Sequence, residues 1–194
     1  MSNIEQIKKL REESGVSMME CKKALEKAKG DIEKAKKYLR ERGEDVAGKR
    51  AGRSAGEGVI ASYIHSNSKV GVLLDIRCES DFVARSDDFK SLAHEICLQI
   101  AAANPRYVKG EDVKKEEIEE EKEITLKQCK DSGKPENVIE QIVEGRVKKY
   151  KKEVVLLMQP WVKDDKKTIE DLVNEKIAKI GEKVIINRFT RFEI

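Results

Sequence analysis

Apolar residues recur at helical spacing three times within the first forty-odd positions. The three sets are Ile4, Ile7 and Leu10, then Ala24, Leu25 and Ala28, then Ile32, Ala35 and Leu39. Such spacing puts each set on one side of a helix. Three short helices with one apolar stripe each can bury those stripes only against one another. We therefore predict a compact three-helix module over residues 1–43.

Polar residues and glycines mark the ends of these helices. The predicted starts are the capping boxes Ser2 with Glu5 and Ser17 with Glu20, and the cap Asp31. The predicted stops are Gly15, Gly30 and Gly43. An oxygen at each start can accept from free backbone N–H groups, and glycine at each stop tolerates the left-handed conformation.

Residues 44–58 are rich in glycine, alanine and scattered charge, and we predict a flexible linker there. A phosphate-binding loop is the alternative for a glycine-rich stretch. That loop needs a preceding strand and a terminal Gly-Lys-Ser/Thr pattern, and the sequence has neither.

Alternation with a period of two begins after the linker. Residues 59–66 and 70–78 alternate and are joined by a short polar connection, which predicts an antiparallel hairpin with one covered face. Residues 184–193 alternate again and supply a third strand. Helical patterns over 87–103, 111–131, 134–158 and 168–181 surround these strands, the second of them almost wholly charged. We predict an α+β fold, with a core over residues 59–194 in which helices cover a three-stranded antiparallel sheet.

The stretch from Cys78 to Arg85 connects the second strand to the next helix. A connection of this kind is usually polar, yet Phe82 stands here beside Asp81. A large apolar side chain on a turn either folds back into the core or is offered to a partner. Spacing alone leaves both possibilities open.

Composition argues against an enzyme with a deep aromatic pocket. Charged residues make up 40% of the chain and aromatic ones 5%. The 40 basic and 37 acidic residues are interleaved, so the net charge of +3 indicates no polyanion partner. The four cysteines are far apart and, like the two histidines, lack metal-ligand spacing, so we expect no metal and no cofactor. With no signal sequence and no apolar run long enough to span a bilayer, we expect a cytoplasmic protein.

Two long stretches resemble one family. Leu10 to Leu25, with the sequence LREESGVSMMECKKAL, resembles the N-terminal signature of bacterial elongation factor Ts. Asp75 to Arg85, DIRCESDFVAR, resembles its second signature, in which Ser80 stands where the family usually has threonine. The stretches 159–165 and 186–189 are similar to its C-terminal pattern, so the resemblance covers essentially the whole chain.

The resemblance implies a guanine-nucleotide exchange factor for elongation factor Tu. It implies that residues 1–43 form a ubiquitin-associated-like domain and that 59–194 form the core, which also dimerises. Long members carry a second core half and a protruding helical hairpin. This chain has one core half and the charged segment at 111–131, and short members pair as homodimers, so we expect a homodimer.

The resemblance also assigns site residues. The segment Ser80, Asp81, Phe82 and Val83 would enter the partner, with Phe82 as a wedge and Asp81 disturbing the water around the partner's Mg²⁺. The partner-binding positions of the N-terminal module would be Lys8, Arg11, Met18 and Met19.

Plainer interpretations stand beside these assignments. Asp81 can be a simple cap, Lys8 and Arg11 a solvated face, and one of Met18 and Met19 can pack inward. A rival function is a ribosome- or RNA-associated module using the basic stretch 49–53, although we expect no direct nucleic-acid contact. A second rival is an adaptor that binds a partner without affecting nucleotide.

Overall fold

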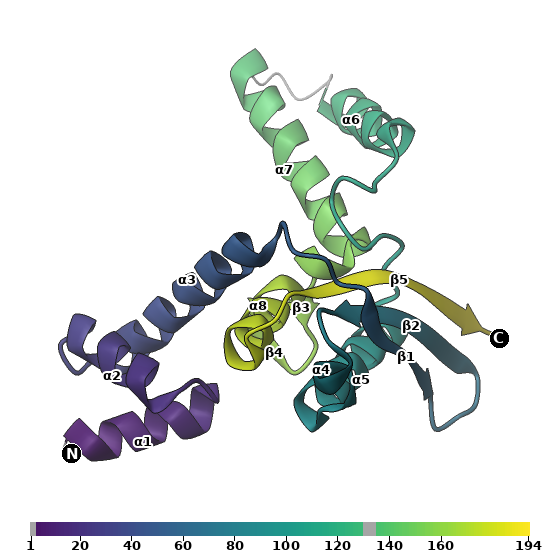
Figure 1. Cartoon of the computed structure of the whole chain (residues 1–194). Coiled ribbons are helices and arrows are strands. Elements are labelled where there is room, and N and C mark those ends of the chain that lie inside the picture. Colours follow the sequence, from purple (N-terminus) through teal and green to yellow (C-terminus); the bar gives the residue numbers. More distant parts are fainter. Residues whose placement is uncertain (1–2, 130–134) are drawn as a thin grey trace.

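The computed structural model describes residues 3–129 and 135–194 as an α+β fold, in agreement with the sequence prediction (Figure 1). Three helices, α1 (Asn3–Ser14), α2 (Met18–Lys27) and α3 (Ile32–Arg50), form the N-terminal module. The sheet comprises β1 (Glu57–Ile64), β2 (Val70–Cys78) and β5 (Val184–Glu193). Between β2 and β5 lie α4 (Asp81–Arg85), α5 (Asp87–Ala103), α6 (Lys115–Cys129), α7 (Glu136–Val154), a 3₁₀ turn η1 (Leu156–Met158), β3 (Pro160–Trp161), β4 (Asp164–Thr168) and α8 (Ile169–Ile180).

The N-terminal helices begin where the sequence predicts. Ser17 accepts a hydrogen bond from the Glu20 N–H at 3.3 Å, and Asp31 accepts one from Lys34 N–H at 3.1 Å. Gly15 and Gly30 have positive φ at the first two helix ends. Ser2, the first cap, lies outside the described residues. The module has its own small core, made of Ile7, Leu10, Cys21, Ala24, Leu25, Ala28, Ala35 and Leu39.

Gly43 does not end its helix, so the predicted stop there and the linker predicted from residue 44 were wrong. Helix α3 continues to Arg50, and only residues 51–56 connect it to β1 without helix or strand. Gly43 is buried against α8, where an added Cβ would lie 3.3 Å from the Asn174 carbonyl oxygen. The glycine therefore allows two helices to approach closely, and that packing offsets its low helix propensity.

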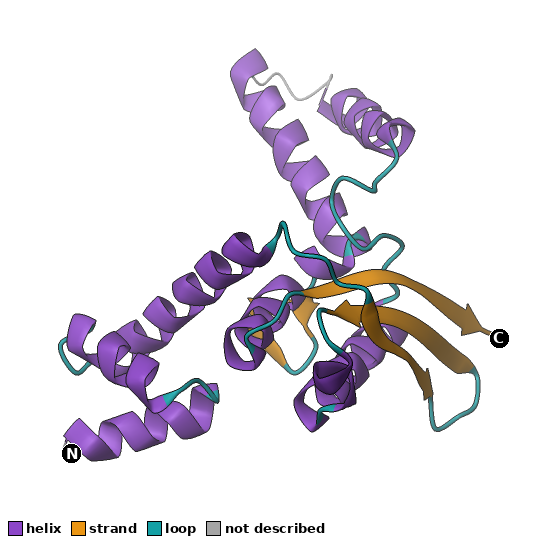
Figure 2. Cartoon of the chain, in the orientation of Figure 1, coloured by secondary structure: helices purple, strands orange, loops and turns teal. Residues whose placement is uncertain are grey.

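The predicted three-stranded antiparallel sheet is confirmed, with the strand order β1-β2-β5 (Figure 2). Its inner face, carrying Val72, Leu74 and Ile76, is buried in the main core. Helix α5 covers this face with fully buried side chains that include Phe89 and Leu92. Helix α8 packs beside α5 and also contacts α3, so it joins the core to the N-terminal module.

The outer face of the sheet carries a buried carboxylate. The register between β2 and β5 shifts after Asp75, which pairs with Arg188 while Ile76 pairs with Ile186. The extra residue, Asn187, donates to Asp75 at 2.8 Å, and Arg77 donates to the same carboxylate at 2.6 and 3.0 Å. Hydrogen bonds from Arg77 and then Asn187 lower the Asp75 pKa to about 2.

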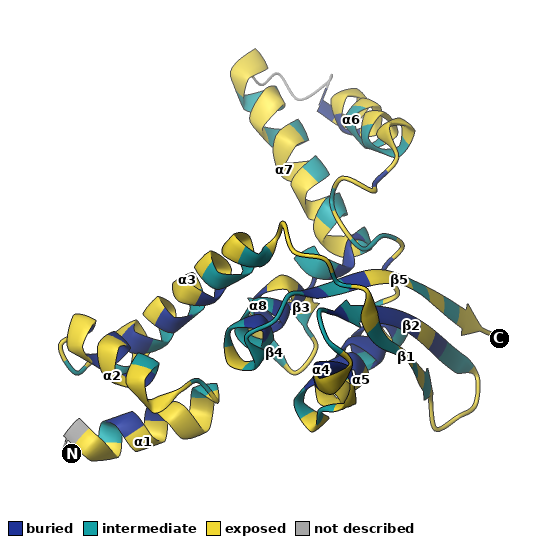
Figure 3. Cartoon of the chain, viewed as in Figure 1, coloured by how far each residue is buried: buried dark blue, intermediate teal, exposed yellow. Residues whose placement is uncertain are grey.

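Helices α6 and α7 form a hairpin that projects from the body, and most of its surface is exposed (Figure 3). The solvated helix predicted for the charged segment is α6, which buries only Thr125 and Cys129 among the described residues. Lys134, the predicted restart, lies outside them. The sequence did not predict the short β3–β4 pair, but the Thr168–Asp171 capping box of α8 and its end at Gly181 are confirmed. No helix in the described part of the chain has the length and apolar character needed to cross a membrane.

The low pKa of Asp75 predicts acid-dependent stability. Because the folded-state pKa lies below the ordinary value of 3.8, the ionised carboxylate stabilises the fold above about pH 4, and this contribution disappears as pH falls toward 2. Asp75→Asn should lower the free energy of unfolding by on the order of 1 kcal/mol or more at pH 7, and by less at pH 2. Urea unfolding of both proteins at a series of pH values measures the difference. A deficit that does not change with pH would contradict this assignment.

Candidate functional site

The segment predicted to meet a partner folds as a one-turn helix between two serine caps. Ser80 follows β2 by two residues and has an extended backbone. Its hydroxyl accepts from the Val83 N–H at 3.3 Å, and this bond caps the start of α4. Ser86 ends α4 by donating to the Val83 carbonyl at 2.8 Å, and it begins α5 by accepting from the Phe89 N–H. Two helix caps within seven residues thus define the shape of this connection.

Helix α4 buries one side in the core and exposes the other side to solvent. Val83 and Ala84 are 7% and 5% exposed and belong to the main core. Phe82 is 81% exposed, which is far from a core position. The structure therefore decides between the two possibilities that spacing left open: Phe82 points to solvent, and its neighbours anchor the helix. Val83, assigned to the same segment, is one of those anchors.

Asp81 lies beside Phe82 on the exposed surface of α4. Its carboxylate forms an ion pair with Arg85, one helical turn further on. Both side chains are largely exposed, so the pair is weak and can open when a competing charge arrives. An aromatic ring and a carboxylate are thus presented next to each other on a short, anchored element.

The four positions predicted in the N-terminal module are all exposed. Lys8 and Arg11 follow Ile4 at helical spacing on α1, and Ile4 is 66% exposed. Met18 and Met19, at the start of α2, are 47% and 62% exposed. The interpretation that one methionine packs inward was wrong, because Cys21, Ala24 and Leu25 form the buried side of α2. This surface and α4 belong to separate parts of the molecule (Figure 1).

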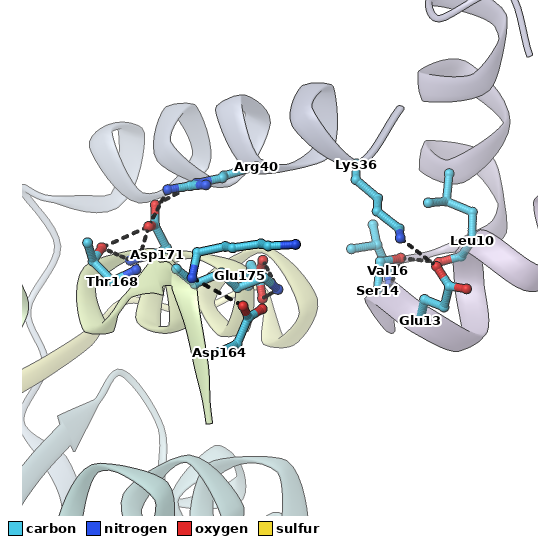
Figure 4. Close-up of polar contacts among 12 residues, drawn as sticks. Leu10, Glu13, Ser14, Val16, Lys36, Arg40, Asp164, Thr168, Asp171 and Glu175 are labelled. Atoms are coloured by element: carbon cyan, nitrogen blue, oxygen red, sulfur yellow. Dashed lines mark hydrogen bonds and ion pairs between the residues drawn. The ribbon is translucent and has the colours of Figure 1, made fainter. Parts of the chain in front are cut away.

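A cleft of about 670 Å³ lies between the N-terminal module and the core. Ion pairs on its walls include Lys36 with Glu13 at 3.0 Å (Figure 4) and Lys167 with Glu175 at 2.7 Å. Nearby, Arg40 of α3 donates to Asp171 of α8 at 2.8 Å. Burial would raise the Asp171 pKa, but hydrogen bonds from Thr168 and Arg40 outweigh that effect and lower it. The first two pairs each lie within one part of the chain, whereas the Arg40–Asp171 contact joins the N-terminal module to the core.

The basic stretch at 49–53 is engaged within the molecule. Arg50 and Arg53 donate to the Glu79 carboxylate at 3.3 and 3.0 Å. Two of the three cations proposed for an RNA contact are thus already paired with a carboxylate beside α4, which weakens the RNA-binding alternative.

Groups suited to covalent or metal chemistry are not assembled at these surfaces. Burial raises the Cys97 pKa to about 11, so its thiol stays protonated near neutral pH. Among residues 3–129 and 135–194, His, Cys, Asp and Glu form no cluster that could hold a metal ion. The exposed apolar side chains of Phe82, Met18 and Met19 are groups that a protein-binding surface can use.

Comparisons with known proteins give one consistent result. The family model described as "Elongation factor TS" matches residues 3–194. Curated proteins named "Elongation factor Ts" are similar over nearly the full length of both chains. That of Thermoanaerobacter sp. (strain X514) is 52% identical over 100% of this chain and 95% of its own length. The proteins of Carboxydothermus hydrogenoformans and Coprothermobacter proteolyticus are each 54% identical, over 100% and 97% of this chain and 89% and 95% of their own lengths.

Two phenylalanines seven positions apart provide a matched test of the exposure of Phe82 on α4. Phe82→Ala should change the free energy of unfolding by no more than about 0.5 kcal/mol, because the ring touches little in the free protein. Phe89→Ala should cost about 3–5 kcal/mol, because Phe89 is completely buried. Chemical denaturation of both variants measures the contrast. Equal losses would mean that Phe82 also packs in the core.

Proposed function

The chain belongs to the elongation factor Ts family of translation elongation factors, and we propose that it releases GDP from elongation factor Tu as a guanine-nucleotide exchange factor. The observation that carries this proposal is the 81% exposed ring of Phe82 on an anchored one-turn helix. Burying an apolar ring of that size in a partner is favourable in free energy, and the ring is held at a fixed place on the surface.

The proposed mechanism is mechanical. A GTPase holds GDP through its phosphate loop and through Mg²⁺, which requires near-ideal octahedral geometry. Phe82 inserts between two helices of the partner's GTPase domain and shifts the elements that support the metal. Asp81 leaves Arg85 and perturbs the water around the Mg²⁺. Ser80 and Val83 support this segment from below, since Ser80 caps α4 and Val83 anchors it in the core.

Thermodynamic linkage turns that displacement into exchange. A factor that binds the nucleotide-free partner better than the GDP-bound partner weakens GDP binding by the same ratio. A coupling of about 3 kcal/mol corresponds to roughly a 150-fold change in affinity. Burial of Phe82 contributes roughly 1.5–3 kcal/mol of this, so other contacts must supply the rest.

We assign a separate share of the binding free energy, outside this coupling, to the N-terminal module. Its exposed residues Lys8, Arg11, Met18 and Met19 form a second contact with the same partner. Methionine side chains are flexible and polarizable, which suits a contact surface. The two cations restrict the orientation in which the partner can bind. This anchor keeps the factor bound while α4 acts.

We further propose that the chain is a homodimer formed through the outer face of its sheet. Ile60, Ile64 and Phe192 on that face are each 65% exposed, and Leu73 at its centre is 48% exposed. The register aligns Ile64, Gly71 and Phe192 in one row across the three strands. Because an apolar sheet face of this kind usually marks an interface, a second copy in a symmetric arrangement is a suitable occupant.

The exchange proposal predicts the behaviour of a wedge variant. Catalytic amounts of the wild-type protein should accelerate release of fluorescent GDP from elongation factor Tu. Phe82→Ala should lower the exchange efficiency by about 10- to 100-fold, in line with the loss of its buried area in the complex. Val162→Ala, which truncates another exposed apolar side chain on the β3–β4 turn, serves as the control and should keep full activity.

Each outcome of this experiment distinguishes a different possibility. A stable complex without faster GDP release would favour the adaptor function. Normal exchange by Phe82→Ala would contradict the wedge assignment but leave exchange itself intact.

The homodimer proposal is tested by sedimentation. The wild-type protein should sediment as a dimer, and Leu73→Glu should sediment as a monomer because it places a charge at the centre of the apolar face. Ile124→Glu on α6, at a comparably exposed position, should remain dimeric. A monomeric wild-type protein at micromolar concentration would contradict the proposal.

A further inference from the structure

Two consecutive residues after α8 hold two consecutive residues before α4. The Glu182 carboxylate accepts hydrogen bonds from the Ser80 N–H at 3.0 Å and from the Ser80 hydroxyl at 2.7 Å. The Lys183 N–H donates to the Glu79 carboxylate at 2.7 Å. We name Glu79, Ser80, Glu182 and Lys183 the clasp. It joins segments about a hundred residues apart in the sequence, at the point where the wedge helix begins.

Glu182 determines how the Ser80 hydroxyl is used. A hydroxyl has one hydrogen to donate and lone pairs with which to accept. Because the hydrogen is directed to Glu182, a lone pair of the same oxygen remains for the Val83 N–H, which is the capping bond of α4. A negative acceptor also strengthens the bond that it receives. Glu182 thus fixes both the backbone and the cap orientation of the residue that starts α4.

The other half of the clasp ties α4 to the end of α3. Glu79 accepts from Arg50 and Arg53 as well as from Lys183, and the Lys183 ammonium group donates to the Arg53 carbonyl at 2.8 Å. The Lys183 backbone bond, together with the two guanidinium groups, lowers the Glu79 pKa. The segment that connects the N-terminal module to the sheet is therefore held against the base of the wedge.

A helix as short as α4 needs such support. Five residues are too few to form a stable helix alone, because nucleation costs more than one turn of hydrogen bonds returns. Val83 and Ala84 anchor one side, but two small contacts leave the direction of the helix poorly defined. A group that must enter a partner at a defined place works best when supporting hydrogen bonds fix its orientation beforehand.

We propose that Glu182 is a positioning residue for nucleotide exchange, which acts through Ser80 and holds α4 so that Phe82 and Asp81 meet the partner in one orientation. This inference rests on the proposed exchange function. Glu182 itself needs no contact with elongation factor Tu. A purely structural role for Glu182 would stabilise the whole fold and affect exchange only through the amount of folded protein.

The first arm of the test examines the free protein. Glu182→Gln keeps the size of the side chain but replaces one of the two acceptor oxygens by an NH₂ donor and removes the negative charge, so one Ser80 donor loses its acceptor oxygen. Amide hydrogen exchange at Ser80 and Val83, measured by NMR, should become about tenfold faster, as expected for local opening, while β2 amides stay protected. Glu175→Gln, on α8 with its carboxylate paired to Lys167, is the matched control and should leave α4 unchanged. Unchanged exchange at Ser80 and Val83 in Glu182→Gln would overturn the proposal.

The second arm measures GDP release. Glu182→Gln should lower the maximal release rate by about tenfold while the concentration for half-maximal acceleration changes little, since the wedge is misdirected and the N-terminal contact remains. Glu175→Gln, which leaves the clasp intact, should retain the wild-type rate. In the Phe82→Ala background, Glu182→Gln should have a clearly smaller further effect, because the contribution of Phe82 is already lost and only that of Asp81 remains to be misdirected.

The outcomes separate the two proposals. Equal losses from Glu182→Gln in the wild-type and Phe82→Ala backgrounds, or a loss that follows thermal stability alone, would overturn the positioning role and leave the exchange function standing. A wild-type protein that releases no GDP would overturn the exchange function and the positioning role with it, while the amide exchange would still report whether the clasp orders α4.

Discussion

The position of α8 is the constraint on which the rest of the structure depends. Near its start, Asp171 is bound by Arg40, and Asn174 lies against Gly43, so α8 fixes α3 and the N-terminal module. Near its end, Lys176 and Lys179 pair with Asp88 at 3.2 and 2.6 Å, which fixes the start of α5. The loop that follows holds Ser80 through Glu182. One helix thereby positions the N-terminal module, the main core and α4 relative to one another.

This arrangement answers a physical problem that any protein wedge presents. The ring of Phe82 gains free energy only when it leaves water, so in the free protein it remains exposed and contributes little to folding. The fold must therefore hold α4 by other means. The structure uses the two serine caps, the buried side chains of Val83 and Ala84, and the ionic contacts around Glu79 and Ser80.

Local sequence signals predicted most of the fold because they act over a few residues. The Ser17 and Asp31 caps, the Thr168–Asp171 box and the alternation of β2 each depend on neighbours within about one turn or one strand, and the structure confirms them. Gly43 misled the prediction, because a glycine that lets α8 approach is identical in sequence to one that ends a helix. The bulge at Asn187 had no signal of its own, since only the register against β2 makes it an extra residue.

The same difference between local signals and contacts of distant residues applies to the candidate site. The two family signatures marked the exposed residues, and the side chains of Phe82, Met18 and Met19 do reach solvent. Glu182 could not be found in this way, because its partner Ser80 lies 102 positions earlier and a single glutamate in a charged chain carries no pattern. The burial of Val83 could not be predicted from the sequence either. Which side chains of a five-residue helix face the core depends on the position of its cap residue.

Many charged side chains of this molecule form ion pairs with other parts of the same chain. This limits how charge can contribute to the recognition of a partner. The 40 basic and 37 acidic residues nearly cancel, and cations such as Arg40, Arg50 and Arg53 are paired with carboxylates of other elements. A nearly neutral surface of interleaved ion pairs exerts little long-range attraction, and salt screens what remains. Selectivity must then come from contacts at short range. The exposed apolar side chains of Phe82, Met18 and Met19 are the groups suited to that, because their burial can be realised only on a surface of matching shape.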